Sequence, residues 1–188
     1  AEICELFIKI NKYLHHSGVQ RVIYKPTPWI YHCYPAEEDL YALINVCHAQ
    51  LVARDISSTI PFDSCIKFNE SRRSGVRKAK RAGVTVRESQ DLATFWDILD
   101  KNLTNKYATH PVHSLEELTL LHSWFPNSIR LFMAYNDKGI AIGGTIIYEM
   151  PRVVHSQYIS ASPEGKRLGA IDLLFDYILN NVYANHKG

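Results

Sequence analysis

The chain has 188 residues, 46% of them hydrophobic and 21% charged, and its formal net charge is +2. This composition excludes a disordered polyelectrolyte, and the near balance of charge gives no overall signal for nucleic acid. No apolar run reaches the roughly 18 residues that span a bilayer, and no secretory pattern opens the sequence. We therefore expect a cytoplasmic protein without an integral membrane segment.

The first 60 residues predict two helices joined by extended chain. Apolar residues recur at helical spacing over residues 3–14, and Gly18 ends that helix. Residues 19–24 are rich in β-branched side chains and predict a strand before Pro26. Residues 35–47 predict a second helix with an acidic first turn. The apolar residues of this second helix are expected to form a buried stripe of Leu40, Leu43, Ile44 and Cys47.

A basic segment begins the second part of the chain. Residues 70–83 predict a short helix, in which six of the ten residues from Arg72 to Arg81 are basic, and a strand follows at 84–87. Asp91 is expected to cap the next helix. Ser114 and Glu117 have the spacing of a capping box, which predicts the start of another helix.

Three strands and a final helix are predicted in the remainder. The strands are expected at 129–135, 140–149 and 153–161, with a hairpin turn at Asn136 to Gly139 between the first two. A helix is expected over 168–183. It is entered through the loop 162–170, which contains Gly165 and Gly169. Glycines ahead of a helix N-terminus favour an anion site, because they let a ligand approach free backbone N–H groups.

This order of elements resembles the first two-thirds of a GNAT-superfamily domain. The basic helix, glycine stop and strand over 72–86, together with residues 155–160, resemble the second domain of the Fem-like branch, which joins two GNAT-type domains in tandem. The resemblance implies an α/β fold with a mixed α+β sheet. Residues 1–68 would be the closing part of a first GNAT-like domain, and residues 69–188 would be an incomplete second one.

The function implied by this resemblance is acyl or aminoacyl transfer to an amine. The donor would be acyl-CoA or aminoacyl-tRNA, used as a substrate and not as a permanently bound cofactor. The acceptor would be a small molecule or a cell-wall precursor, with tRNA as a further partner. With Gly169 as the central glycine, the loop departs from the usual GNAT spacing in a way that suits the Fem-like branch. The residues implied in donor binding are Ser160, Gly165, Lys166, Arg167, Gly169 and Ala170.

Two side chains of the last strand are candidates for catalysis. His155 would act as a base and Tyr158 as a proton donor to the leaving group, while a backbone N–H within 158–161 would stabilise the oxyanion. Strict alternation along a strand places His155 and Tyr158 on opposite faces. The alternatives are a hydrogen-bonded sheet histidine and a packed strand tyrosine.

No metal site is expected from the cysteines or histidines. Cys4, Cys33, Cys47 and Cys65 contain no C-x-x-C pair, and we interpret them as buried or bystander thiols in a reducing compartment. His110, His113 and His122 lack a further ligand at convincing spacing. His113 has the alternative role of lining a substrate cleft.

The basic helix is the clearest local anomaly in charge. We predict that it contacts an anion, although a solvated charged face is an equal alternative. Two further hypotheses compete with the enzyme: a non-catalytic GNAT-like module that binds an anionic ligand or a partner, and an accessory domain that binds RNA or a lipid surface. The predicted anion-binding residues are Arg73, Arg77, Lys78 and Arg81.

Overall fold

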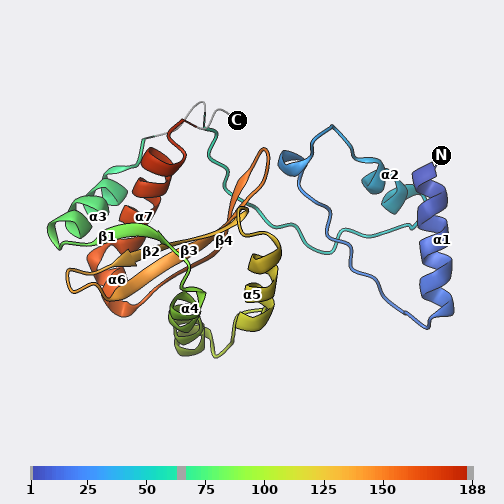
Figure 1. Cartoon of the computed structure of the whole chain (residues 1–188). Coiled ribbons are helices and arrows are strands. Elements are labelled where there is room, and N and C mark those ends of the chain that lie inside the picture. Colours follow the sequence, from blue (N-terminus) through green and yellow to red (C-terminus); the bar gives the residue numbers. More distant parts are fainter. Residues whose placement is uncertain (1, 63–66, 186–188) are drawn as a thin grey trace. The chain divides into compact units, whose positions relative to one another are not determined.

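The computed structural model describes residues 2–62 and 67–185, and the chain forms two compact units, Ala1–Thr59 and Ile60–Gly188 (Figure 1). Cys65 lies outside the described residues. Within the described ranges, every helix is too short or too polar to cross a bilayer.

The first unit is built from helices and irregular chain. Its elements are α1 (Glu2–His16), the 3₁₀ turn η1 (Trp29–Tyr31) and α2 (Glu38–Asn45). Tyr24 donates a hydrogen bond to Asp39 at 2.8 Å, and the Asn11 amide reaches the Cys47 sulfur at 3.2 Å. Cys4, Cys33 and Cys47 are free thiols.

Two predictions for this unit are wrong. Residues 19–24 form no strand, because the described residues of this unit offer no partner strand and Val22 and Ile23 lie exposed. The expected buried stripe of α2 is also absent, since Ile44 is 66% exposed and Ala42 is the one buried side chain described in this unit.

The second unit contains a four-stranded antiparallel sheet in the order β1-β2-β3-β4. The strands are β1 (Thr85–Ser89), β2 (Ile129–Tyr135), β3 (Ala141–Glu149) and β4 (Val154–Ala161). The predicted hairpin turn is confirmed: the Asn136 side chain accepts hydrogen bonds from the N–H groups of Lys138 and Ile140, and Gly139 has a φ of 75°. The predicted α/β class and meander are therefore confirmed.

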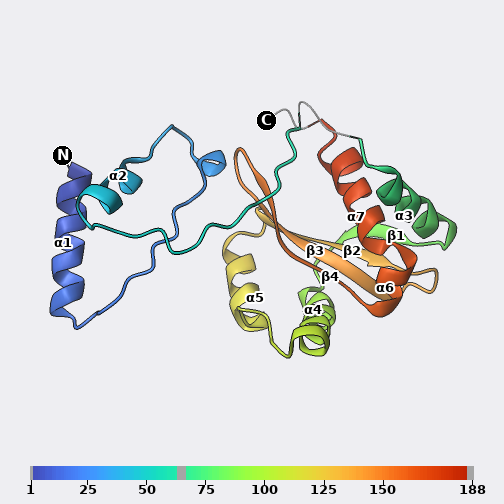
Figure 2. The ribbon, with the colours of Figure 1, turned by 180° about the vertical axis from the view of Figure 1, so that it is seen from behind.

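Helices cover both faces of this sheet (Figure 1 and Figure 2). α4 (Leu92–Tyr107) and α5 (Leu115–Trp124) lie on one face. α3 (Glu70–Arg81) and α7 (Ala170–Tyr177) lie on the other, and they pack against each other. Both predicted caps are confirmed, since Asp91 accepts from the Thr94 N–H and Ser114 forms the full capping box with Glu117.

The helix predicted over 168–183 forms over residues 170–182, but the loop predicted before it, 162–170, contains a short helix of its own. The chain forms α6 (Pro163–Leu168), then α7, then the π-helical turn η2 (Ile178–Val182). Gly169 separates α6 from α7, because its φ of 79° lies in the left-handed region that ends a helix.

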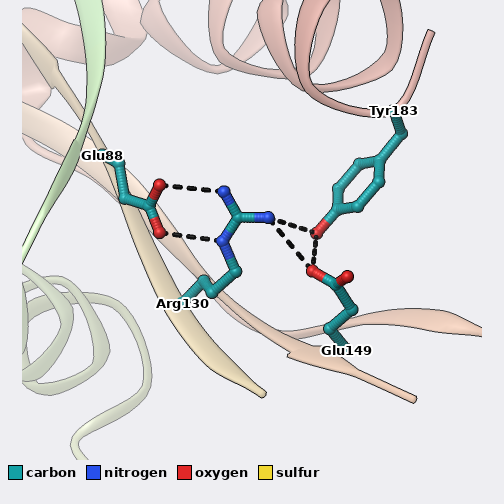
Figure 3. A network of polar contacts seen from close by, with 4 residues as sticks. All are labelled: Glu88, Arg130, Glu149 and Tyr183. Carbon is teal, nitrogen blue, oxygen red and sulfur yellow. Dashed lines mark hydrogen bonds and ion pairs between the residues drawn. The ribbon is translucent and has the colours of Figure 1, made fainter. Parts of the chain in front are cut away.

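A polar network centred on Arg130 joins β1, β2, β3 and the segment after η2 (Figure 3). Arg130 forms a bidentate pair with Glu88, at 2.8 Å for both bonds, and a 3.0 Å bond to Glu149. The Tyr183 hydroxyl donates to the same Glu149 oxygen at 2.8 Å. The hydrogen bond from Arg130 lowers the pKa of Glu88, whereas burial, followed by the bond to Glu149, raises the pKa of Tyr183.

Candidate functional site

A bulge in β4 changes which side chains share a face. Tyr158 pairs with Ile146 and Ser156 pairs with Ile147, so Gln157 is the extra residue. His155 lies opposite Tyr148, which packs on the α4 side of the sheet as Tyr158 does. The expectation of opposite faces is therefore wrong: His155 and Tyr158 both lie on the α4 face.

Tyr158 meets a histidine from another part of the chain. Its hydroxyl is hydrogen-bonded to Nδ1 of His113, and its ring packs edge-on against Trp96 at a centroid distance of 5.0 Å. His155 instead has its Nε2 at 3.1 Å from the Gln157 side chain. The structure thus brings Tyr158 together with His113, which the sequence had assigned to a substrate cleft only as an alternative.

A hollow of about 460 Å³ lies beside this pair, at the connection between α4 and α5. Asp100 lines it and pairs with Nδ1 of His110 at 2.7 Å, and Glu117 lines it from the first turn of α5. Sequence reasoning did not identify Trp96, Asp100 or Glu117 as site residues. The capping box of Ser114 and Glu117, which fixes His113 immediately before α5, was a signal for Glu117 alone.

The outer edge of β4 offers backbone donors near this hollow. The Ser162 N–H bonds to the Ile142 carbonyl of β3 at 3.0 Å. Because N–H groups alternate in direction along a strand, those of Ile159 and Ala161 point away from β3. No strand in the described part of the chain pairs with that edge. Both N–H groups lie within the stretch predicted to hold an oxyanion.

The glycines of the segment 162–170 are used in close packing. A Cβ on Gly165 would lie 2.0 Å from the Ile142 carbonyl oxygen, and one on Gly169 would lie 2.6 Å from that of Gly75 in α3. The Gly165 N–H is already bonded to the Ser162 hydroxyl at 3.1 Å. These close contacts explain why both positions are glycine, without any bound ligand.

The other predicted donor-binding residues differ in exposure and in their contacts. Ser160 is buried and donates to the Ile98 carbonyl at 3.4 Å, and Ala170 is fully buried. Lys166 bonds to the Asn102 side chain, and Arg167 is exposed. The role of this set in donor binding stays a prediction.

The basic helix α3 uses two of its cations to dock on α7. Arg72 pairs with Asp172 at 2.8 Å, and Lys80 pairs with Asp176 at 3.2 Å. The predicted anion-binding residues are placed differently. Arg73 and Arg77 both pair with Glu70 on their own helix, and Lys78 and Arg81 are exposed.

No metal site emerges from the described residues. Nowhere in the ranges 2–62 and 67–185 do three histidine, cysteine or carboxylate side chains gather as a metal would require.

Comparison with known proteins then defines the class. The sequence profile of the family described as "Acetyltransferase (GNAT) domain" matches residues 67–186. The chain therefore belongs to the GNAT acetyltransferase domain family, whose activity is acyl transfer to amines. No curated protein matches the chain in sequence.

Several solved structures are similar to part of this chain. A possible acetyltransferase from Clostridium difficile 630 is 14% identical, with 55% of this chain and 73% of that one covered and a TM-score of 0.45. L-PGS from Bacillus licheniformis is 16% identical with a TM-score of 0.48, over 64% of this chain. The chain spans only 39% of the length of L-PGS. Spermidine N-acetyltransferase from Vibrio cholerae, in complex with CoA and spermine, is 20% identical over 53% of this chain and 65% of that one, with a TM-score of 0.38.

Proposed function

We propose that this chain is an N-acyltransferase whose amine acceptor binds in the hollow beside His113 and Tyr158. The observation that carries the proposal is the hydrogen bond between these two side chains at the bulge of β4. It joins two proton-carrying groups from distant parts of the sequence next to a hollow and to the open edge of the sheet. Acyl transfer needs such groups and backbone donors together.

The two side chains divide the proton transfers between them. The amine nitrogen attacks the acyl carbon of a thioester, a C–N bond forms and the C–S bond breaks. His113 accepts the proton that the amine loses, and the Tyr158 hydroxyl gives its proton to the departing sulfur. Transfer of a proton across the His113–Tyr158 hydrogen bond restores both groups. The outward N–H of Ile159, a residue that is exposed at the edge of the sheet, stabilises the oxyanion.

The hollow favours a cationic amine as the acceptor. Asp100 and Glu117 both line it, and no lysine or arginine does. These carboxylates attract an ammonium group to the hollow, and the ammonium gives one proton to solvent before the neutral amine attacks. His155, on the same face as Tyr158, is a second candidate base in this proposal.

The donor in this proposal is an acyl-CoA. Membership of an acetyltransferase domain family supports a thioester donor, and Lys166 and Arg167 after β4 are exposed cations for its phosphates. The same proposal includes three further points. They are membership of the Fem-like branch, a first GNAT-like domain in residues 1–68, and a cytoplasmic location. Aminoacyl-tRNA is the alternative donor to be tested beside acyl-CoA.

The test measures thiol release from acetyl-CoA with a panel of mono- and polyamines, and aminoacyl transfer from charged tRNA to the same amines. We expect acetyl-CoA to be consumed, with polyamines as the better acceptors. Asp100→Asn should raise the KM for a polyamine about tenfold and change kcat little, because it removes one charge from the acceptor hollow.

The matched control is Asp97→Asn, one turn earlier on α4, where the aspartate pairs with Lys101 outside the hollow. Its KM should stay within about twofold of the unmodified chain. If neither donor is consumed with any amine, the enzyme proposal fails and the non-catalytic binding module takes its place.

A further inference from the structure

A second hollow, of about 420 Å³, lies on the sheet face opposite the acceptor hollow, between α3 and the end of α7. Cationic and apolar side chains predominate among its lining residues. The cations are Lys67, Arg73 and Arg77, the apolar residues are Phe68, Val76 and Leu179, and the remaining two are Asp176 and Asn180. The catalytic proposal uses none of these residues.

The two arginines converge on one anionic group. Arg73 bonds to one carboxylate oxygen of Glu70 at 2.9 Å, and Arg77 bonds to the other. These contacts lower the pKa of Glu70, with Arg77 as the larger cause. Two guanidinium groups that reach the two oxygens of one carboxylate can also reach two oxygens of one phosphate.

Glu70 is well placed to be displaced from the arginines. Its side chain is 66% exposed in the first turn of α3, so it can turn into solvent at little cost. The N-terminal end of α3 adds a partial positive charge at the same place. A phosphate dianion can therefore replace the exposed Glu70 carboxylate as the partner of the two arginines.

The acidic residue in the hollow does not oppose this exchange. Asp176 accepts a hydrogen bond from Asn180 at 2.9 Å and pairs with Lys80 at 3.2 Å, so its charge is already compensated. Lys67, Arg73 and Arg77 remain as the cations facing the ligand.

The apolar residues of the hollow favour a phosphate that carries an apolar group. Phe68, Val76 and Leu179 offer an apolar surface beside the arginines, which a bare inorganic phosphate leaves uncovered. We propose that this hollow binds a phosphomonoester bearing an apolar group, with the phosphate held by Arg73 and Arg77 after they release the Glu70 carboxylate. Such a group can come from a small soluble molecule or from an anionic lipid headgroup.

The experiment uses the full chain, with calorimetry against phenyl phosphate and inorganic phosphate, and cosedimentation with phosphatidylcholine vesicles with and without phosphatidic acid. We expect phenyl phosphate to bind more tightly than inorganic phosphate. The double substitution Arg73→Gln and Arg77→Gln should weaken binding at least about tenfold. Lys78→Gln with Arg81→Gln removes the same charge from α3 outside the hollow, and should change affinity less than about twofold.

Glu70→Gln gives a variant with the opposite expected effect. It keeps every cation and removes the competing carboxylate, so phenyl phosphate should bind a few-fold more tightly. Binding to phosphatidic acid vesicles without binding to phenyl phosphate, with the same dependence on Arg73 and Arg77, identifies a lipid as the source. Equal losses in the two double variants, or weaker binding by Glu70→Gln, would overturn the proposal and leave α3 as a solvated basic face.

Discussion

Arg130→Met should be among the most damaging single changes in the second unit. Arg130 holds Glu88 through two bonds and Glu149 through a third, and methionine keeps most of its apolar length without the charge. The side chains of Arg130 and Glu149 are 24% and 27% exposed, and that of Glu88 is 42% exposed. Breaking a buried ion pair costs about 3–5 kcal/mol, and an exposed pair contributes under about 1 kcal/mol.

The partial exposure of this network places the expected loss between those limits. We expect about 2–3 kcal/mol from Arg130→Met, measured as the shift in the urea unfolding free energy by far-ultraviolet circular dichroism. Lys101→Met is the control, because the Lys101–Asp97 pair is exposed on both sides and should contribute less than about 0.5 kcal/mol. If Arg130→Met unfolds at the same urea concentration as this control, the network does not stabilise the unit.

Three further predictions follow from single contacts. Gly165→Ala should lower the free energy of unfolding by about 1–3 kcal/mol, because its Cβ would lie 2.0 Å from the Ile142 carbonyl oxygen. Thermal melting would show this loss, and an unchanged melting temperature would refute the close packing. Ser114→Ala should cost about 1 kcal/mol in urea unfolding by removing the cap of α5, whereas Ser123→Ala near the end of α5 should cost less. The pKa of Glu88 is depressed below its ordinary 4.5 by Arg130, so its contribution is present above that value and is lost as pH falls through the depressed one. The difference in unfolding free energy between the unmodified chain and Glu88→Gln should therefore shrink below pH 4.5, and a constant difference down to pH 2 would contradict this assignment.

Sequence patterns predicted the sheet of the second unit well because each strand and turn has a local signal. The strand β2 has the predicted bounds, Ile129–Tyr135, and the Asn136 turn and the Ser114 capping box form as expected. The strand predicted at 19–24 failed for the opposite reason. β-branched residues favour a strand only where a partner strand is available, and the described part of the first unit provides none.

The candidate site was harder to predict because it depends on contacts between distant residues. A single extra residue, Gln157, places His155 and Tyr158 on one face, and strict alternation along the strand cannot show such a bulge. The partner of Tyr158 is His113, 45 residues away, and only the fold brings them together. Glycines ahead of a helix start suggested an anion site, yet Gly165 and Gly169 have close packing contacts that the sequence does not reveal.

The central claim is that the Tyr158 hydroxyl gives its proton to the leaving sulfur in acyl transfer. The most direct measurement is the single-turnover rate of amide formation, with acetyl-CoA bound first and the best amine added, for Tyr158→Phe and for Tyr107→Phe. Tyr107 ends α4 and lies outside the acceptor hollow, so it provides the same chemical change without the contact to His113. We predict a loss of about 10²-fold for Tyr158→Phe and less than about twofold for Tyr107→Phe. Equal rates for the two variants would contradict the assignment of Tyr158 and His113 to the chemistry.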